Sequence, residues 1–367
     1  MAEIGDIVQS TRQLAEGCVM RLLRLNEPIS AGIILSYRCT CECRHCMYAC
    51  SPRWSNDWFR LDDLKQILSK LAYYFMRFYP HNVQGVLGLN YGLHFTGGEP
   101  FLNFNLLLEA IRIAKEFKIP SVFVETNCFW CVDDDSKRLL LRLKEAGLDG
   151  ILISINPFTV EFVPYENMLR ALKYSIEVFG RNNVMLYHPL YYELLNLINA
   201  KGRIEFEEFV RRLLSKSPAL LSRSLDPGIL LPMGRLVYRL EKLYEHYPAR
   251  QFFNEACTYE LTRPWHIHID CYCNYVPGYC AGISLGDARR LNEMVENGIE
   301  LDDRPILQAL CMGLGHLYRF AVENYGYRER RDGYISKCHL CLDIRRHIVE
   351  RSKEFKELQP LEFYRHL

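Results

Sequence analysis

The sequence predicts an α/β protein with a partial (β/α)6 TIM-like barrel, followed by a smaller cysteine-rich domain at its C-terminal end. First, short apolar runs of strand length alternate with amphipathic helical patterns over residues 31–225. This alternation is typical of right-handed parallel βαβ units. Second, only five or six such units fit before the composition changes near residue 226, so the barrel is incomplete. Third, cysteines recur beyond that point.

The predicted elements of the barrel follow one another at regular spacing. Six apolar runs have strand length, at residues 31–35, 93–95, 121–124, 150–155, 184–187 and 229–231. Helical periodicity is clearest over residues 61–75, 106–117 and 135–146. Because the ligands of such barrels gather at the carboxyl ends of the strands, the residues that follow each strand are the candidates for a functional site.

The chain divides into four parts. Its 367 residues are enough for two domains with substantial cores. Residues 1–30 form a lead-in, within which residues 11–25 are predicted to be an amphipathic helix. Residues 31–225 form the barrel, residues 226–346 the cysteine-rich domain and residues 347–367 a tail.

Composition and charge exclude several classes of function. Lysine and arginine number 45 against 44 acidic residues, a net charge of +1, which argues against a general polyanion or nucleic-acid binder. No apolar run approaches the ~18 residues of a membrane span, and the first residues lack the basic and apolar regions of a signal peptide. Fifteen cysteines without an export signal are typical of metal ligands, so a cytoplasmic location is expected.

Three cysteines directly after the first strand carry the most specific signal. They have the spacing Cys39-x3-Cys43-x2-Cys46. A four-iron four-sulfur cube held by four thiolates is an electron carrier, whereas a cube held by three presents one iron that binds a small molecule. The spacing therefore indicates a site for chemistry.

A second motif follows the second strand and reads Thr96-Gly97-Gly98-Glu99-Pro100. Two glycines let a backbone approach a ligand closely. The carboxylate of Glu99 can accept hydrogen bonds from an ammonium group, and Pro100 fixes the exit of the turn. A plain strand-to-helix turn has a similar composition.

In this order, the two motifs resemble the signatures of the radical S-adenosylmethionine (radical SAM) superfamily. The resemblance covers roughly residues 33–345 and implies a [4Fe-4S] cluster on Cys39, Cys43 and Cys46 whose open iron binds S-adenosylmethionine. For Asn156, which precedes a proline, a local turn or capping role is the alternative. The cofactor contacts that the resemblance implies are His45, Gly97, Gly98, Glu99, Pro100, Thr126, Asn127, Ser154 and Asn156.

The C-terminal cysteines resemble the SPASM or twitch extensions of many superfamily members. That resemblance implies an auxiliary [4Fe-4S] cluster with the ligands Cys257, Cys280, Cys338 and Cys341. Tetrahedral zinc suits the same cysteines and is the alternative, with His266, His268 or His339 as further donors. Packing of four free thiols is a third interpretation. The roles of five more cysteines stay open, and either of the last two can replace a ligand: Cys50, Cys128, Cys131, Cys271 and Cys273.

The resemblance also implies a reaction class. One electron from an external reductant such as ferredoxin or flavodoxin cleaves S-adenosylmethionine, and the 5′-deoxyadenosyl radical abstracts hydrogen from a substrate. The auxiliary cluster takes part in electron transfer. Relatives with auxiliary clusters often modify peptides, so a peptide or protein side chain is the expected substrate; a small metabolite, a lipid or a cofactor precursor is the alternative.

Two rival functions make different predictions. A non-catalytic electron-transfer protein requires a fourth ligand at the first site, for which Cys41 and Cys50 are the neighbours. A methyltransferase that uses the same cofactor releases S-adenosylhomocysteine instead of 5′-deoxyadenosine. The product of turnover therefore separates the enzymatic alternatives.

Overall fold

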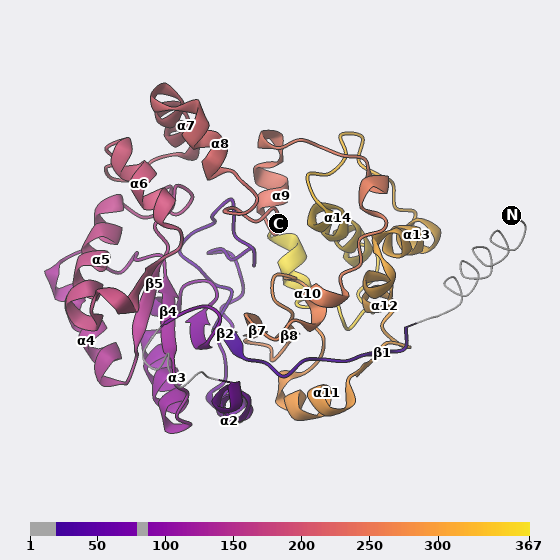
Figure 1. The fold of residues 1–367 in the computed structure, drawn as a ribbon, viewed down its shortest axis with the longest axis horizontal. Coiled ribbons are helices and arrows are strands. Elements are labelled where there is room, and N and C mark those ends of the chain that lie inside the picture. Colours follow the sequence, from indigo (N-terminus) through magenta and orange to yellow (C-terminus); the bar gives the residue numbers. More distant parts are fainter. Residues whose placement is uncertain (1–19, 79–86) are drawn as a thin grey trace, which may run out of the picture.

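The computed structural model describes residues 20–78 and 87–367, which form a mixed α/β fold around one dominant sheet (Figure 1). Seven strands are hydrogen-bonded in the order β6-β5-β4-β3-β2-β7-β8. Neighbours from β6 to β7 run parallel, and only β8 is antiparallel. The strands are β2 Ser30–Ile34, β3 Gly92–Thr96, β4 Val122–Thr126, β5 Gly150–Ile153, β6 Val184–Leu186, β7 Ile267–Asp270 and β8 Tyr275–Val276.

Helices follow the strands of the barrel in the predicted alternation. The expected helices at 61–75, 106–117 and 135–146 correspond to α2, α3 and α4. Each buries an apolar stripe, as Leu64, Ile67 and Leu71 of α2 illustrate, and this stripe is the period-3.6 signal that predicted the helix. The helices are α2 Leu61–Phe78, α3 Phe104–Glu116, α4 Lys137–Glu145, α5 Tyr165–Phe179 and α6 Pro189–Leu197.

The sixth parallel strand is β7 and not the apolar run at 229–231, so that prediction was wrong. Residues 229–231 lie in a bent segment, because the chain just after them is held over the cysteine loop by a hydrogen bond from Arg235 N to Cys46 O of 3.0 Å. β7 comes from the segment that we assigned to the C-terminal domain. It pairs with β2 in the register Ala31↔Ile267.

The end of the predicted lead-in helix is extended. Residues 11–19 of that prediction lie outside the described residues, but β1 Leu22–Leu23 pairs antiparallel with β9 Ile299–Glu300. Leu23 and Leu25 are buried while Arg24 between them is exposed. Burial with a period of two is the pattern of a strand, and the apolar residues were too few to establish a helical period.

The helices from Thr258 onward form a helical part beside β7 and β8, whereas the two helices within residues 206–224 lie beside α6 (Figure 1). Within the helical part, α12 packs against α13, and α13 packs against α14. The helices after α6 are α7 Phe206–Lys216, α8 Pro218–Ser224, α9 Leu236–Arg239, α10 Thr258–Thr262, α11 Leu291–Asn297, α12 Pro305–Met312, α13 Leu314–Tyr325 and α14 Lys337–Val349.

Candidate active site

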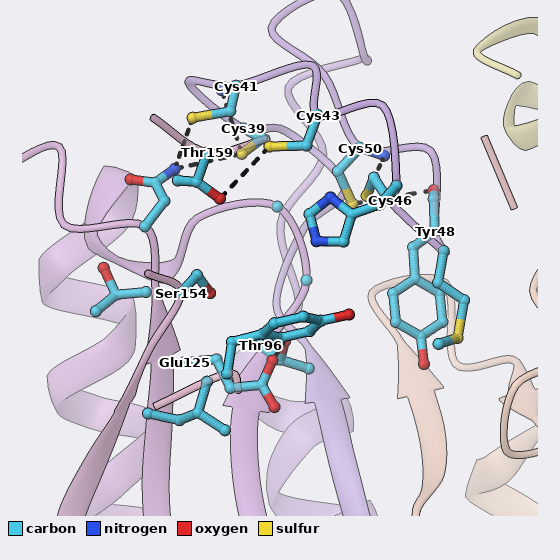
Figure 2. A pocket seen from close by; sticks show the side chains of 18 of the residues that line it. Cys39, Cys41, Cys43, Cys46, Tyr48, Cys50, Thr96, Glu125, Ser154 and Thr159 are labelled. Atoms are coloured by element: carbon cyan, nitrogen blue, oxygen red, sulfur yellow. Dashed lines mark hydrogen bonds between the residues drawn. The ribbon is translucent and has the colours of Figure 1, made fainter. Parts of the chain in front are cut away.

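A cavity of about 280 Å³ lies at the carboxyl ends of the parallel strands. The cysteine loop, which connects β2 to α2, lies over the strand ends (Figure 2). The three predicted ligands Cys39, Cys43 and Cys46 all line the cavity. The structure therefore brings the three sulfurs to the place where ligands of such barrels bind.

Arg235 holds the cysteine loop in place from a distant segment. Its side chain is buried and donates hydrogen bonds of 2.9 Å to the carbonyl oxygens of Cys43 and Cys50. A third bond, of 3.0 Å, reaches the carbonyl oxygen of His366 near the C-terminus. A guanidinium group has five donors in a rigid fork, so this one side chain can hold two points of the cysteine loop and one point near the C-terminus together. No sequence motif pointed to this residue.

The sulfurs themselves receive contacts that favour thiolates. The side-chain amide of Asn127 donates to Cys39 Sγ at 3.6 Å, and Thr159 Oγ1 lies 3.8 Å from Cys43 Sγ. The Cys50 side chain, by hydrogen bonding, lowers the pKa of the Cys46 thiol to about 6 against the opposing effect of burial. Hydrogen bonds to cluster sulfurs are a means by which proteins set reduction potentials.

Cys41 and Cys50 also lie in the cysteine loop and line the cavity. Cys41 N donates to Cys39 Sγ at 3.3 Å, and hydrogen bonding with Cys39 and Cys43 raises the pKa of the Cys41 thiol. Cys128 and Cys131 are buried outside the cavity lining. The structure therefore does not join Cys50 to that pair in a single group.

The two glycines of the second motif let two loops touch. A Cβ atom on Gly98 would overlap with the carbonyl group of Arg38, and Gly97 has φ +123°. The turn is bonded to the start of the cysteine loop, with Gly98 N donating to Ser36 O at 2.8 Å and Glu99 N to Arg38 O at 3.0 Å. Both glycines also line the cavity, so their backbone is open to a ligand.

The carboxylate of Glu99 is turned away from the cavity lining, where we expected it to meet an ammonium group. It accepts hydrogen bonds from Thr126 Oγ1 at 2.9 Å, from Asn127 N at 2.7 Å and from Phe101 N. Burial raises the pKa of Glu99 to about 7, although these bonds oppose the shift. Pro100 begins the 3₁₀ turn Pro100–Asn103, and it too is absent from the lining. The cofactor contacts predicted for Glu99 and Pro100 stay predictions.

The polar residues after β4 and β5 divide into two groups. Thr126, Asn127 and Ser154 line the cavity as expected. Asn156 does not, because its Oδ1 accepts hydrogen bonds from Phe158 N and from both N and Oγ1 of Thr159. These are the contacts of a local turn, which the sequence offered as the alternative to cofactor binding for Asn156.

His45 gives the cavity an aromatic wall. Its ring stacks on Phe158 with 4.6 Å between centroids and meets Tyr187 edge-on at 5.4 Å. Burial, with a smaller effect of Arg235, lowers the pKa of His45 to about 3, so the ring is neutral at physiological pH. A neutral ring beside a tyrosine suits a flat aromatic ligand.

Sequence reasoning missed four residues that point into the same cavity. Glu125 lies on the strand side below the cysteines (Figure 2), and burial raises the pKa of its carboxyl group to about 7. Tyr48, His266 and His268 also line the cavity. The alternation of the two histidines along one strand was visible in the sequence, but only the pairing of β7 with β2 brings them to the site.

Comparison with known proteins identifies the family of the segment that contains the cysteine loop. Residues 33–193 match the family model of the Radical SAM superfamily. This segment is a radical SAM domain. The protein is an enzyme of the radical SAM oxidoreductase kind, and the matched range contains the cysteine loop and the Gly97–Gly98 turn.

The other comparisons add little to this assignment. No curated protein matches the chain. A solved structure titled "Crystal structure of BtrN in complex with AdoMet and 2-DOIA" is similar to 80% of this chain and 90% of its own, with a TM-score of 0.38 and 12% identity. At that level of similarity, nothing about substrate follows. Within residues 20–78 and 87–367, no helix has the length and apolar character needed to cross a bilayer.

A second, smaller pocket beside the radical SAM domain collects the C-terminal cysteines. Its lining includes all four predicted auxiliary ligands together with Lys337 and Arg345. Cys338 and Cys341 lie on the first turns of α14, Cys257 directly precedes α10, and Cys280 follows β8. Burial raises the pKa of Cys280 and of Cys338 to about 12 when nothing is bound to the sulfurs.

The other donors considered for this pocket lie elsewhere. His266 and His268 line the barrel cavity. Both ring nitrogens of His339 already have hydrogen-bond partners: Arg330 Nη1 lies 3.0 Å from Nε2, and Ile335 N donates to Nδ1. Cys271 and Cys273 are absent from the pocket lining. The pocket is thus a four-cysteine site among the residues that the structure describes. Met233 and Tyr279 line both the pocket and the barrel cavity, so the two sites are neighbours.

Proposed function

We propose that this radical SAM enzyme binds a [4Fe-4S] cluster and S-adenosylmethionine in the barrel cavity and abstracts hydrogen from the side chain of a peptide or protein. The observation that carries the proposal is the convergence of Cys39, Cys43 and Cys46 on a cavity at the strand ends. Three thiolates leave one iron of a cube without a protein ligand. The cavity below them, lined by neutral and polar groups, fits a molecule bound at that iron.

The residues of the cavity have separate tasks in this proposal. The backbone at Gly97 and Gly98 and the side chain of Asn127 face the region next to the sulfurs, where the amino-acid end of the cofactor binds. His45 and Tyr187 offer aromatic surface for its adenine. When bound, the cluster and its cofactor supply the one-electron cleavage that yields a 5′-deoxyadenosyl radical.

The protein's part in the reaction is to hold the substrate next to the cofactor and to exclude other hydrogen donors. The cavity volume, about 280 Å³, is at the lower end of the range for ligand sites. A cofactor of the size of S-adenosylmethionine fills a cavity of this volume, so the volume does not select the substrate. We propose a side chain of a peptide or protein because relatives with auxiliary clusters often modify peptides; a small metabolite, a lipid or a cofactor precursor is the alternative.

We propose that Cys257, Cys280, Cys338 and Cys341 hold an auxiliary [4Fe-4S] cluster in electron transfer. Four sulfurs in one buried pocket provide a complete ligand set. Lys337 and Arg345 stabilise the negative charge of the thiolates: each lowers the pKa of Cys338 against the effect of burial. The shared wall of Met233 and Tyr279 gives electrons a short path between the two sites. Zinc bound to the same four cysteines is the competing assignment.

Iron and sulfide analysis with electron paramagnetic resonance tests the proposal on anaerobically reconstituted protein. We expect about eight irons per chain, falling to about four in the Cys39→Ala, Cys43→Ala, Cys46→Ala triple variant. S-adenosylmethionine should alter the spectrum of the wild type only, and a one-electron reductant such as ferredoxin or flavodoxin should then release 5′-deoxyadenosine.

The other outcomes separate the rivals. About four irons falling to none leaves the radical site intact and assigns zinc or free thiols to the C-terminal pocket. S-adenosylhomocysteine as product indicates methyl transfer. A spectrum that does not respond to S-adenosylmethionine contradicts the proposal and favours an electron carrier.

A further inference from the structure

Three buried histidines converge on one side of the radical SAM cavity. His94 lies on β3, His268 lies on β7, and His266 directly precedes β7. Their side chains each offer one ring nitrogen, and these three nitrogens lie within 4.8 Å of one another. All three residues are at least nine-tenths buried. None of them has a task in the function proposed above.

The sheet creates room for an atom between two of these rings. Gly32 of β2 is the register partner of His94 on one side and of His268 on the other. A Cβ atom on Gly32 would lie 2.6 Å from His268 Nε2 and closer still to His94 Nε2. Both nitrogens therefore lie next to the same small space beside Gly32 of β2. Any residue larger than glycine would fill that place.

Two ring nitrogens of this histidine cluster have no hydrogen-bond partner among the described residues, and a third ring is held through its other nitrogen. His94 Nε2 and His266 Nδ1 have no hydrogen-bond partner among the described residues, although both atoms are buried. His268 Nδ1 is bonded to Tyr48 Oη at 2.9 Å, which leaves Nε2 as its available nitrogen. Buried polar atoms are rarely left without a partner, and metal-bound histidines commonly use their second nitrogen in such a bond.

A carboxyl group lies beside the histidines. Glu125 Oε1 lies 3.5 Å from His94 Nε2, while Glu125 Oε2 accepts a hydrogen bond of 2.8 Å from Thr96 Oγ1. Burial lowers the pKa of all three histidines, so the imidazoles are neutral and need not lose a proton before they bind a cation.

We propose that His94, His266 and His268 form a mononuclear site for a divalent transition-metal ion such as Zn²⁺. Three neutral imidazoles are a preferred donor set for such ions, and a site with three protein ligands keeps a position open. Glu125, His266 and His268 line the barrel cavity, so the open position faces it. An oxygen donor of the substrate, such as a carboxylate or a carbonyl group, would take that position. This last role rests on the proposed function, whereas the metal site itself does not.

The test is zinc content and zinc K-edge X-ray absorption of the cluster-loaded enzyme after incubation with Zn²⁺ and desalting. We expect one zinc per chain with a first shell of nitrogen and oxygen at about 2.0 Å. His94→Gln and His266→Gln should each lower zinc retention at least tenfold without changing the iron content. His316→Gln, outside the cavity, is the matched control and should retain zinc.

Gly32→Ala tests the geometry without touching a ligand, because it fills the place between the rings and should also prevent retention. If these variants fold poorly, as a loss of iron would reveal, the spectrum of the wild type still decides. A sulfur shell at about 2.3 Å would place the zinc on cysteines and overturn the proposal. Failure of the wild type to retain zinc would do the same. The iron content and the formation of 5′-deoxyadenosine, which test the proposed function, are independent of these results.

Discussion

The two cysteine sites of this enzyme are built in opposite ways. In the barrel, three cysteines come from one loop and face a cavity of about 280 Å³ with polar groups on its far side. In the C-terminal part, four cysteines come from three separate segments and surround a pocket of only about 40 Å³. A centre that must bind a second molecule needs the first arrangement. A centre whose ligands are all protein needs only the second.

The sharpest way to separate the two sites is to remove the second. We expect a Cys338→Ala, Cys341→Ala variant to lose about four irons per chain and to stop forming modified substrate. It should still cleave S-adenosylmethionine in the presence of a strong reductant, because the barrel cavity is intact. Liquid chromatography of 5′-deoxyadenosine and of substrate measures both activities. Loss of cofactor cleavage as well would show that the two sites do not function separately.

A substitution of Arg235 should disrupt the cysteine loop of the barrel site without changing any residue of the cysteine motif. Arg235→Leu leaves the buried carbonyl oxygens of Cys43, Cys50 and His366 without their donor. Each unsatisfied group costs about 1–3 kcal/mol, so the loss of three donors predicts a destabilisation of about 3–9 kcal/mol. Iron should be lost from the barrel and kept by the C-terminal pocket.

Denaturant unfolding and iron analysis measure these two effects. Arg239→Leu is the control, since its side chain is half exposed and lies 3.8 Å from Glu42. Equal losses of iron and of unfolding free energy in both variants would show that the hydrogen bonds of Arg235 to the cysteine loop do not stabilise the barrel site.

The same contrast explains what the sequence was able to predict. Cys39, Cys43 and Cys46 lie close together in the sequence, and the alternation of strands and helices around them is a local pattern, so both could be predicted without a structure. Arg235 reaches the cysteine loop, and His266 and His268 reach the cavity, only through contacts between distant segments, which the spacing of residues in the sequence does not reveal. The motif also predicts that Glu99 contacts the cofactor, and this stays a prediction; in the structure its buried carboxyl group accepts hydrogen bonds from Thr126, Asn127 and Phe101.

The buried carboxyl group of Glu99 should make stability depend on pH. Its folded pKa, about 7, is above the ordinary value of 4.5, so folding favours the protonated form. The stabilisation is complete below about pH 4.5 and is lost as pH rises through 7, a change of about 1–3 kcal/mol. Glu99→Gln should remove this part of the decline. Urea unfolding of both proteins between pH 5 and 8 measures it, and parallel curves would show that Glu99 does not titrate in this range.

The smallest expected effect concerns Cys41, which lies between the predicted ligands Cys39 and Cys43 in the sequence. If the barrel site has an open iron, Cys41→Ser should leave the iron content, the response to S-adenosylmethionine and the cleavage rate within about twofold of the wild type, because no ligand is lost. If Cys41 were the fourth ligand, the same change should instead create an open iron and a response that the wild type lacks. Electron paramagnetic resonance of the two proteins, each with and without S-adenosylmethionine, distinguishes these cases. Cys128→Ser, at a buried cysteine outside the cavity lining, is the matched control.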